Sequence, residues 1–442
     1  MPIFMVHGTR DASVPVESAD AIAAEFRRLG KRNLVYRRLD GLDHGWRDVA
    51  GGAHVREVLK EVGTWLGSVV EQETGLATPQ RCSRTAPRVE QPRPARLAPN
   101  VRDISADLEP IRAKGEVPAL AAAEWRGGEL LAIGATGVRT EGDVARVTTD
   151  DPWHLGSDTK AMTAVLVAIW IDRGKLRFDE TLGELFGTGV HPGYRAVTVE
   201  QLLQHRGGLP HQFPSDIWKD MWRGGGDPKA RAAAIQALLS RPPMQKPGTF
   251  QYANSGYVTL GEALERVTGQ RWEDLIRTDL FAPLGMASCG FGAPEGRVPS
   301  GHRRAWWGAW KPVTGELADN PPANAPAGGV YCILRDWGKF LALVLAGARG
   351  EHVALVADAT MKRLLTPPLD AKEDERYAGG WLFLTRSWAN GLVLTHSGSN
   401  TLWLVAAWLA PRKNLAFAAA ANAYEPRTVD SAFSTMIPVY AK

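Results

Sequence analysis

The sequence predicts an α+β protein in which an antiparallel sheet flanked by helices carries a helical lobe and follows a short, partial α/β segment. Strands are expected at both ends of residues 102–442 and helices in the middle, a pattern typical of one sheet plus a helical lobe. Residues 1–70 instead alternate strand, helix, strand and helix. Residues 71–101 interleave Pro with Arg and Gln and hold little apolar content, which indicates an extended, solvated linker.

The first zone holds two strand-like runs, each followed by a helical run. PIFMVHG (2–8) and NLVYRRLDG (33–41) are the strands, and SADAIAAEFRRLG (18–30) is an amphipathic helix that ends at a glycine. AHVREVLKEVGTWLGSVV (53–70) is the second helix.

The third zone begins and ends with strands. ALAAAEWRGGELLAIGATGV (119–138) is consistent with two strands joined at a Gly-Gly pair. Near the C-terminus, the strands are expected in LVLTHSGSN (392–400), TLWLVAAWLAP (401–411) and LAFAAAANA (415–423). The expected helices lie near Ser157–Arg173, Val199–Gln204, 229–240, 255–268, 334–347 and 427–440.

The composition excludes several classes of protein. The chain has 442 residues, of which 44% are hydrophobic and 23% charged, so we expect folded domains. The net charge is only +4 and no dense Lys/Arg run is interleaved with aromatics, which argues against nucleic acid as a partner. No apolar run approaches a membrane span, and no signal peptide is visible. A cytoplasmic or undetermined location follows, and the sequence allows a homo-oligomer.

We expect neither a disulfide framework nor a metal centre. The three cysteines are few, odd in number and far apart, and they form no CxxC pair. They are Cys82, Cys289 and Cys332. Three histidines invite a metal interpretation, but no Cys or carboxylate is placed in the sequence to complete a site. They are His205, His211 and His396.

The stretch HLGSDTKAMTAVLVAIWIDRGKL (154–176) places a serine and a lysine at the start of a long apolar helix. Unpaired N–H groups and the helix dipole favour negative charge near Ser157, and Lys160, at i+3, lies on the same face. A free lysine is only about 0.04% neutral at pH 7, so Lys160 must be desolvated or lie near another cation to take a proton from serine. A helix cap followed by an exposed lysine would explain the same residues.

A second stretch, GTFQYANSGYVTLGEALERVTG (248–269), carries a Tyr-x-Asn pair just before an apolar helix. Tyr252 and Asn254 can point the same way from a short turn. The phenol can relay a proton, and the amide can hold both a substrate carbonyl and the lysine. Alone, this is also an ordinary turn before a helix.

A third stretch, THSGSNTLWLVAAWLAP (395–411), begins a strand that we place at a sheet edge. Gly398 allows a substrate backbone to approach closely, and the N–H of Ser399 can point into a cleft. His396 precedes them. It can be part of the site, or it can be a purely structural histidine at the end of a strand.

In this order and at these separations, SxxK, YxN and His-Ser-Gly resemble the motifs of the serine β-lactamase and penicillin-recognising family. Within it, the closest resemblance is to class C β-lactamases, DD-peptidases and β-lactamase-fold esterases. VTVEQLLQHRGGLPHQFP (197–214) resembles the family's LLxHxSGLP segment, and FAPLGMASCGF (281–291) resembles its PLGM turn. RGKLRFDETLGELF (173–186) resembles the stretch after the nucleophile helix. The resemblance covers roughly 105–440 and implies a β-lactamase/DD-peptidase-like fold.

The resemblance implies roles for the motif residues. Ser157 resembles the acylated nucleophile and Lys160 its base partner, while Tyr252 resembles the general acid/base that passes a proton to the leaving group and later activates water. Asn254 resembles the amide that positions the substrate. The oxyanion hole would be the N–H groups of Ser157 and Ser399. Tyr-Ala-Asn in place of Ser-Asp-Asn places the chain on the class C and esterase side.

Two further residues bear on the substrate. Gln212 matches a glutamine that binds the substrate amide in class C enzymes. His396 departs from the lysine that helps β-lactamases bind the substrate carboxylate, and an imidazole is mostly neutral at pH 7. Attraction for an anionic β-lactam should therefore be weaker, and many relatives with His here are esterases or peptidases.

The sequence thus favours a carboxylesterase that acts on small-molecule, short-acyl esters through an acyl-enzyme, without a cofactor, and hydrolyses β-lactams weakly. A class C-like β-lactamase or D-amino-acid peptidase on the same site stays open. So does a non-catalytic penicillin-binding or regulatory module.

The N-terminal zone resembles the last third of an α/β-hydrolase. Asp11 and His44 match the acid and histidine of that triad, but no serine elbow precedes Asp11. We interpret residues 1–70 as an inactive remnant with a role in packing or in dimer contact.

Overall fold

The computed structural model divides the chain into two compact units, Met1–Glu90 and Gln91–Lys442. The structure describes residues 3–10, 16–29, 31, 34–43, 47–48, 54, 58–62, 65, 97–306 and 308–441. The proline-rich linker expected at 71–101 lies outside these residues except for its last five positions.

The N-terminal unit contains a strand–helix–strand arrangement. Strands β1 (Ile3–Gly8) and β2 (Leu34–Leu39) pair in parallel, and helix α1 (Val16–Arg28) lies between them in the sequence. A short helix follows at residues 58–62. The two candidate triad residues of the N-terminal zone, Asp11 and His44, lie outside the described residues.

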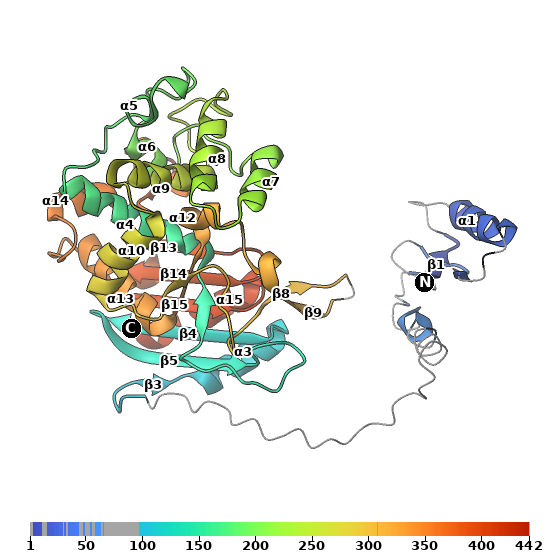
Figure 1. Cartoon of the computed structure of the whole chain (residues 1–442). Helices are drawn as coiled ribbons and strands as arrows, with labels where there is room; N and C mark the ends of the chain where they lie inside the picture. The colour runs from blue at the N-terminus through green and yellow to red at the C-terminus, as the bar shows by residue number, and fades with distance from the viewer. Residues whose placement is uncertain are drawn as a thin grey trace. The chain divides into compact units, whose positions relative to one another are not determined.

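The C-terminal unit is built on an eight-stranded sheet in the order β11-β12-β13-β14-β15-β4-β5-β3 (Figure 1). Neighbouring strands are antiparallel except β3 and β5, which are parallel. The strands are β3 (Arg102–Asp103), β4 (Ala119–Arg126), β5 (Glu129–Gly137), β11 (Tyr377–Ala378), β12 (Trp381–Arg386), β13 (Gly391–Gly398), β14 (Leu404–Ala410) and β15 (Leu415–Ala421). The chain is therefore an α+β protein with strands from both ends of the unit, as predicted.

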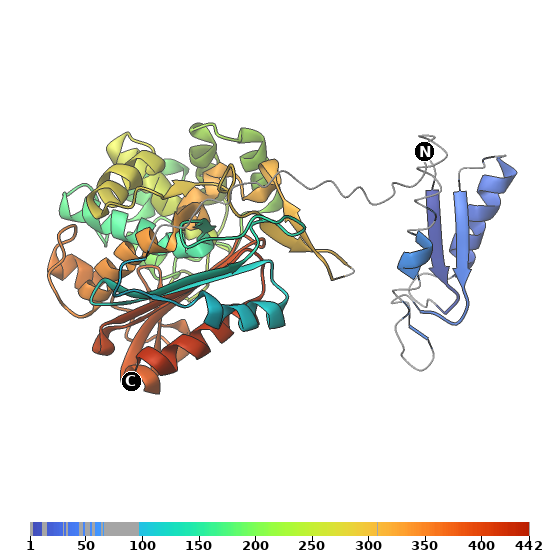
Figure 2. The same ribbon diagram turned by 90° about the horizontal axis from the view of Figure 1, so that it is seen from below.

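The two faces of this sheet pack against different helices. Figure 2 shows α3 (Ser105–Gly115) and α15 (Pro426–Tyr440) together along one face. On β4, Leu120 and Ala122 belong to the hydrophobic cluster under these helices, whereas Ala121 and Ala123 belong to the cluster on the opposite face. This alternation is the two-residue period of a strand with both faces buried.

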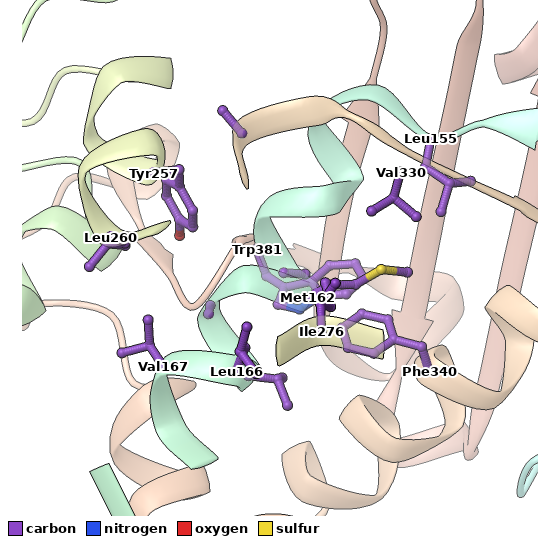
Figure 3. Close-up of a cluster of buried hydrophobic side chains, with 14 of the residues drawn as sticks. Leu155, Met162, Leu166, Val167, Tyr257, Leu260, Ile276, Val330, Phe340 and Trp381 are labelled. Carbon is purple, nitrogen blue, oxygen red and sulfur yellow. The ribbon is translucent and has the colours of Figure 1, made fainter. Parts of the chain in front are cut away.

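The helical lobe covers that opposite face. Its central helix, α4 (Thr159–Asp172), is buried at every position from Thr159 to Ile169, which explains why its sequence is apolar all round. Figure 3 shows Met162 and Leu166 of α4 within the cluster that also includes Trp381. In the described ranges, no helix has the length and apolarity that crossing a membrane requires.

The remaining elements surround this core. The helices are α5 (Leu182–Phe186), α6 (Val199–Leu203), α7 (Ser215–Gly224), α8 (Lys229–Leu239), α9 (Asn254–Thr268), α10 (Trp272–Ile276), α11 (Ala282–Leu284), α12 (Ala325–Gly328), α13 (Leu334–Ala348) and α14 (Asp358–Leu364). Two small sheets contain β6 (Pro152–His154), β7 (Gly290–Phe291) and β10 (Val330–Ile333) in one, and β8 (Gly301–Arg304) and β9 (Trp310–Val313) in the other.

Two sequence-based expectations need correction. Cys289 and Cys332 form a disulfide although 43 positions separate them, because β7 and β10 pair antiparallel with Gly290 opposite Tyr331. Sequence spacing does not reveal this pairing.

The His-Ser-Gly segment does not begin a strand at a sheet edge. It ends β13, which lies between β12 and β14. Pairing with β12 stops at Thr395, so from His396 onward one side of β13 is free for another segment to approach.

Candidate active site

Ser157 lies in a 3₁₀ turn, η1 (Gly156–Asp158), that leads into α4 beside the end of β13. Two glycines permit this approach. A Cβ added to Gly156, whose φ is +50°, would lie 2.2 Å from the backbone nitrogen of Ser399. A Cβ on Gly398 would lie 1.9 Å from the carbonyl oxygen of Leu155. No side chain fits at either position, so the backbone nitrogen of Ser399 comes next to the turn that carries Ser157.

Lys160 extends from the first turn of α4 into the protein interior and is completely buried. Its Nζ lies 3.0 Å from Oγ of Ser157, 2.7 Å from Oδ1 of Asn254 and 2.6 Å from the carbonyl oxygen of Ala327. Oδ1 and the carbonyl oxygen can only accept, so they take two amine hydrogens in either protonation state. The third position on nitrogen, a hydrogen or a lone pair, faces Ser157. The amine is arranged to exchange one proton with the serine hydroxyl.

Burial favours the neutral form of this amine. Removal from water holds the pKa of Lys160 well below its usual range, while the nearby carboxyl of Asp158 acts in the opposite direction. The desolvation that the sequence requires for a lysine base is therefore present.

The Tyr-x-Asn pair is held by the loop that follows α6. Helix α6 begins with a capping box between Thr198 and Gln201, and its chain leaves through His205, whose φ is +57°. Nδ1 of His205 accepts a hydrogen bond of 3.2 Å from the N–H of Ala253, and its carbonyl oxygen accepts one of 2.8 Å from Gln251. This loop fixes the turn just before α9.

His211 holds the same turn from its other side. Its Nδ1 lies 2.9 Å from the carbonyl oxygen of Tyr252, and its own carbonyl oxygen accepts a 2.9 Å hydrogen bond from the N–H of Asn254. Because a carbonyl oxygen can only accept, Nδ1 of His211 carries the proton. Among the described residues, no three or more His, Cys, Asp or Glu side chains are grouped so that they could hold a metal ion.

Tyr252 contacts both Lys160 and Ser157. Its ring centroid lies 5.0 Å from Nζ of Lys160. Burial raises the pKa of Tyr252 above its usual value, although its hydrogen bond to Ser157 acts against this. The phenol is therefore protonated at neutral pH and suited to donate a proton.

His396 approaches the cluster from β13. Its ring lies 6.0 Å from that of Tyr252, centroid to centroid, and its side chain is 8% exposed. Burial, helped by the charge of Lys160 when that amine is protonated, lowers the pKa of His396 to about 3. The imidazole is neutral in ordinary buffers, so it provides no cation for a substrate carboxylate.

The structure does not bring every predicted residue equally close. Gln212 follows His211 on the loop that contacts the Tyr-x-Asn turn, but its side chain is exposed. Ser399 contributes its backbone, and its hydroxyl donates a 2.5 Å hydrogen bond to the carbonyl oxygen of Trp403 instead.

Sequence reasoning missed two buried residues beside the motif. Asp158, next to Ser157, is 1% exposed, and its carboxylate oxygens have no hydrogen-bond partner among the described residues. Burial raises its pKa well above the usual value, with Lys160 opposing. A charged residue at the start of an apolar helix was the available signal. Tyr377 comes from the distant strand β11, and its ring lies 5.8 Å from His396, centroid to centroid; no local pattern marks it.

Comparison with known proteins identifies the family to which the chain belongs. The family model described as Beta-lactamase matches residues 104–435, which is most of the chain. Penicillin-binding protein 4 of Amycolatopsis lactamdurans is 29% identical over 314 residues, which cover 65% of this chain and 74% of that protein. The acyltransferase mokF of Monascus pilosus is 27% identical over 158 residues, 32% of this chain and only 38% of that protein.

A solved structure shows the same fold. The class C beta lactamase from Rhodobacter sphaeroides superposes with a TM-score of 0.61 at 22% identity, covering 76% of this chain and 98% of that one. The family match, the fold and the arrangement around Ser157 lead to one conclusion: the chain belongs to the beta-lactamase family of serine hydrolases.

Proposed function

We propose that this chain is a carboxylesterase that cleaves short-acyl esters through an acyl-enzyme on Ser157 and hydrolyses β-lactams weakly. The observation that carries the proposal is the coordination of Lys160: two pure acceptors hold its amine so that the remaining position faces the serine hydroxyl, 3.0 Å away.

The proposed acylation moves one proton and one acyl group. Ser157 Oγ attacks the ester carbonyl carbon while its proton passes to the neutral amine of Lys160. The N–H groups of Ser157 and Ser399 stabilise the oxyanion. The carbon–oxygen bond to the leaving group breaks, Tyr252 gives that oxygen its proton, and the proton on Lys160 restores the phenol. Water then attacks the acyl-enzyme by the reverse route, releasing the acid and free Ser157.

The preference for esters over β-lactams rests on His396. A β-lactam antibiotic brings a carboxylate that a cation would attract, whereas a simple ester brings none. With a pKa of about 3, His396 has no charge to offer at neutral pH. Asn254 is assigned to the substrate's carbonyl group, and Gln212 to the amide group of a β-lactam, which a simple ester lacks.

Two alternatives predict other outcomes. A class C-like β-lactamase or a D-amino-acid peptidase would use the same nucleophile on a different substrate. A non-catalytic penicillin-binding or regulatory module would bind without turnover, which the complete set of motifs disfavours.

The test compares hydrolysis of p-nitrophenyl butyrate and of a chromogenic cephalosporin by the wild type, Ser157→Ala and the control Ser434→Ala. Ser434 lies on the surface of α15, where its hydroxyl donates to the carbonyl oxygen of Asp430 in the preceding turn. We expect fast ester turnover and slow cephalosporin turnover, both abolished by Ser157→Ala and unchanged in the control. Faster turnover of the cephalosporin would favour the β-lactamase alternative, and activity that survives Ser157→Ala would refute the proposal.

A further inference from the structure

Asp319 belongs to none of the three motifs, but it contacts His154 and Asn400, which are near Ser157 and Ser399 in the sequence. It sits between two short 3₁₀ turns, η4 (Gly315–Ala318) and η5 (Pro322–Asn324), and its side chain is 11% exposed. Its two carboxylate oxygens contact different segments. One segment leads to Ser157, and the other leads away from Ser399.

The first segment is reached through His154, the last residue of β6, which is completely buried. Nδ1 of His154 accepts a 3.1 Å hydrogen bond from the backbone N–H of Gly156. Because a backbone N–H can only donate, the ring proton of a neutral His154 is on Nε2. Nε2 lies 3.0 Å from Oδ2 of Asp319, although its N–H is not well aligned with this oxygen. The N–H of Gly156 thus fixes the tautomer, and the carboxylate of Asp319 lies beside the remaining ring N–H of the imidazole that holds the Leu155–Gly156 peptide, one before the N–H of Ser157.

The second segment is reached through Asn400, the residue after Ser399. Nδ2 of Asn400 donates to Oδ1 of Asp319 and to the carbonyl oxygen of Ala318, each at 3.1 Å. Its Oδ1 accepts a 3.2 Å hydrogen bond from the N–H of Leu402. Asn400 is 8% exposed, so these bonds hold the turn after β13 in a protected environment.

We propose that Asp319 is a positioning residue that holds the two donors of the oxyanion hole in place, through His154 on one side and Asn400 on the other. This inference rests on the proposed function, because it assigns the N–H groups of Ser157 and Ser399 to the oxyanion. The two donors come from segments more than 240 positions apart in the sequence, and Asp319 contacts the immediate support of both.

The physical reason lies in preorganisation. An oxyanion hole stabilises the transition state only if both N–H groups already point to the place where negative charge develops. Losing one donor outright typically lowers the rate by about 10²–10³-fold. Releasing both donors partially should lower kcat by about 10-fold or more while leaving KM nearly unchanged, since ground-state binding needs the donors less.

The experiment compares Asp319→Ala and Asp319→Asn with the control Asp336→Asn. Asp336 is a similarly buried acid that bonds Ser288 and Lys339, residues that lie outside both segments. The readouts are fluorophosphonate labelling, kcat and KM for p-nitrophenyl butyrate, and the inhibition constant of an alkyl boronic acid, whose tetrahedral adduct occupies the oxyanion hole.

We expect Asp319→Ala to lower kcat and to weaken boronate binding by similar factors of about 10-fold or more, with KM within about twofold of the wild type. Asp319→Asn should lose less kcat and less boronate affinity, because the oxygen of the asparagine side chain can still accept a hydrogen bond from Asn400. This variant also keeps the test valid if the alanine variant does not fold. The control should resemble the wild type.

Two results would overturn the inference, and they differ. If the wild type is labelled and active but both Asp319 variants match the control in kcat and boronate affinity, or change KM alone, Asp319 is not a positioning residue. If the wild type is neither labelled by the fluorophosphonate nor active on the ester, the proposed function fails, and this inference with it.

Discussion

The amine nitrogen of Lys160 lies 3.0 Å from the hydroxyl oxygen of Ser157, and both of its other hydrogen-bond partners are groups that can only accept. The protonation state of the lysine therefore affects the serine directly. Burial lowers the pKa of this lysine, so the neutral amine is available under conditions where an exposed lysine would be charged. Three predictions about activity follow from this cluster.

The first prediction concerns the lysine itself. Lys160→Met removes the base, and Lys160→Arg keeps a cation that does not lose its proton, so both should lower kcat/KM for p-nitrophenyl butyrate by about 10²–10⁴-fold. In the wild type, activity should fall as the pH drops through the lowered pKa of Lys160, well below the range of a free lysine. An arginine variant with near-normal activity would show that Lys160 acts as a charge and not as a base.

The second prediction concerns the partner of the lysine. Oδ1 of Asn254 lies 2.7 Å from Nζ of Lys160, so Asn254→Asp places a carboxylate there and favours the charged amine. We expect the acid limb of the kcat/KM profile to move to higher pH, with low activity at pH 7 that partly recovers in alkaline buffer.

Asn254→Ala is the control for this experiment. It removes the amide without adding charge, so its lost activity should not recover at alkaline pH. An acid limb that stays in place in Asn254→Asp would mean that another group limits the reaction.

The third prediction concerns substrate preference. The pKa of His396 is lowered to about 3, so this residue should cause no inflection near pH 6–7 in the ester profile. His396→Lys supplies a cation and should raise the ratio of cephalosporin to ester kcat/KM by about 10-fold or more, the scale of one charge-assisted hydrogen bond. His396→Gln adds no charge and should leave the ratio near the wild-type value. If both variants have the same ratio of cephalosporin to ester kcat/KM, His396 does not determine the substrate preference.

The fourth prediction concerns stability at Glu124, on the face of β4 that packs against α3 and α15. Its side chain is fully buried, and its carboxylate oxygens have no hydrogen-bond partner among the described residues. Burial raises the pKa of Glu124 to about 8, against the opposing charge of Arg126. In the unfolded chain the group ionises near pH 4.5, so stability should fall as the pH rises from about 4.5 to 8.

Glu124→Gln removes this titration. It should be more stable than the wild type at pH 8, by an amount of the order of a few kcal/mol, and the difference should shrink toward pH 4.5. Urea unfolding at both pH values measures it, with Glu129→Gln on the exposed part of β5 as the control. A difference that does not change with pH would show that Glu124 is not buried in its neutral form.

The sequence predicted many of the helices and strands and the motif residues that are close in sequence, but it did not predict the helices α3, α7 and α14. Ser157 and Lys160 are three positions apart where the turn η1 leads into α4, and Tyr252 and Asn254 are two positions apart just before and at the start of α9, so their proximity needs no knowledge of the fold. Several strands and helices of the C-terminal unit follow continuous apolar runs in the sequence, as on α4 and β15, which are buried along most or all of their length.

Relationships that depend on how distant segments pair were not predictable in this way. The bond between Cys289 and Cys332 follows from the pairing of β7 with β10, and the position of His396 follows from where β12 stops. Asp319 contacts His154 and Asn400, which lie 165 positions before it and 81 after it. No local sequence pattern predicts such contacts, because the distant segments come together only in the folded protein.

The central claim is that Ser157 is the nucleophile, and mapping a covalent adduct tests it most directly. The wild type and Ser157→Ala are treated with a fluorophosphonate, digested and analysed by mass spectrometry, and ester turnover is measured on the same samples. The account predicts a single adduct on the peptide that contains Ser157, loss of turnover in step with labelling, and neither in Ser157→Ala. An adduct on another residue, or full ester turnover by Ser157→Ala, would contradict it.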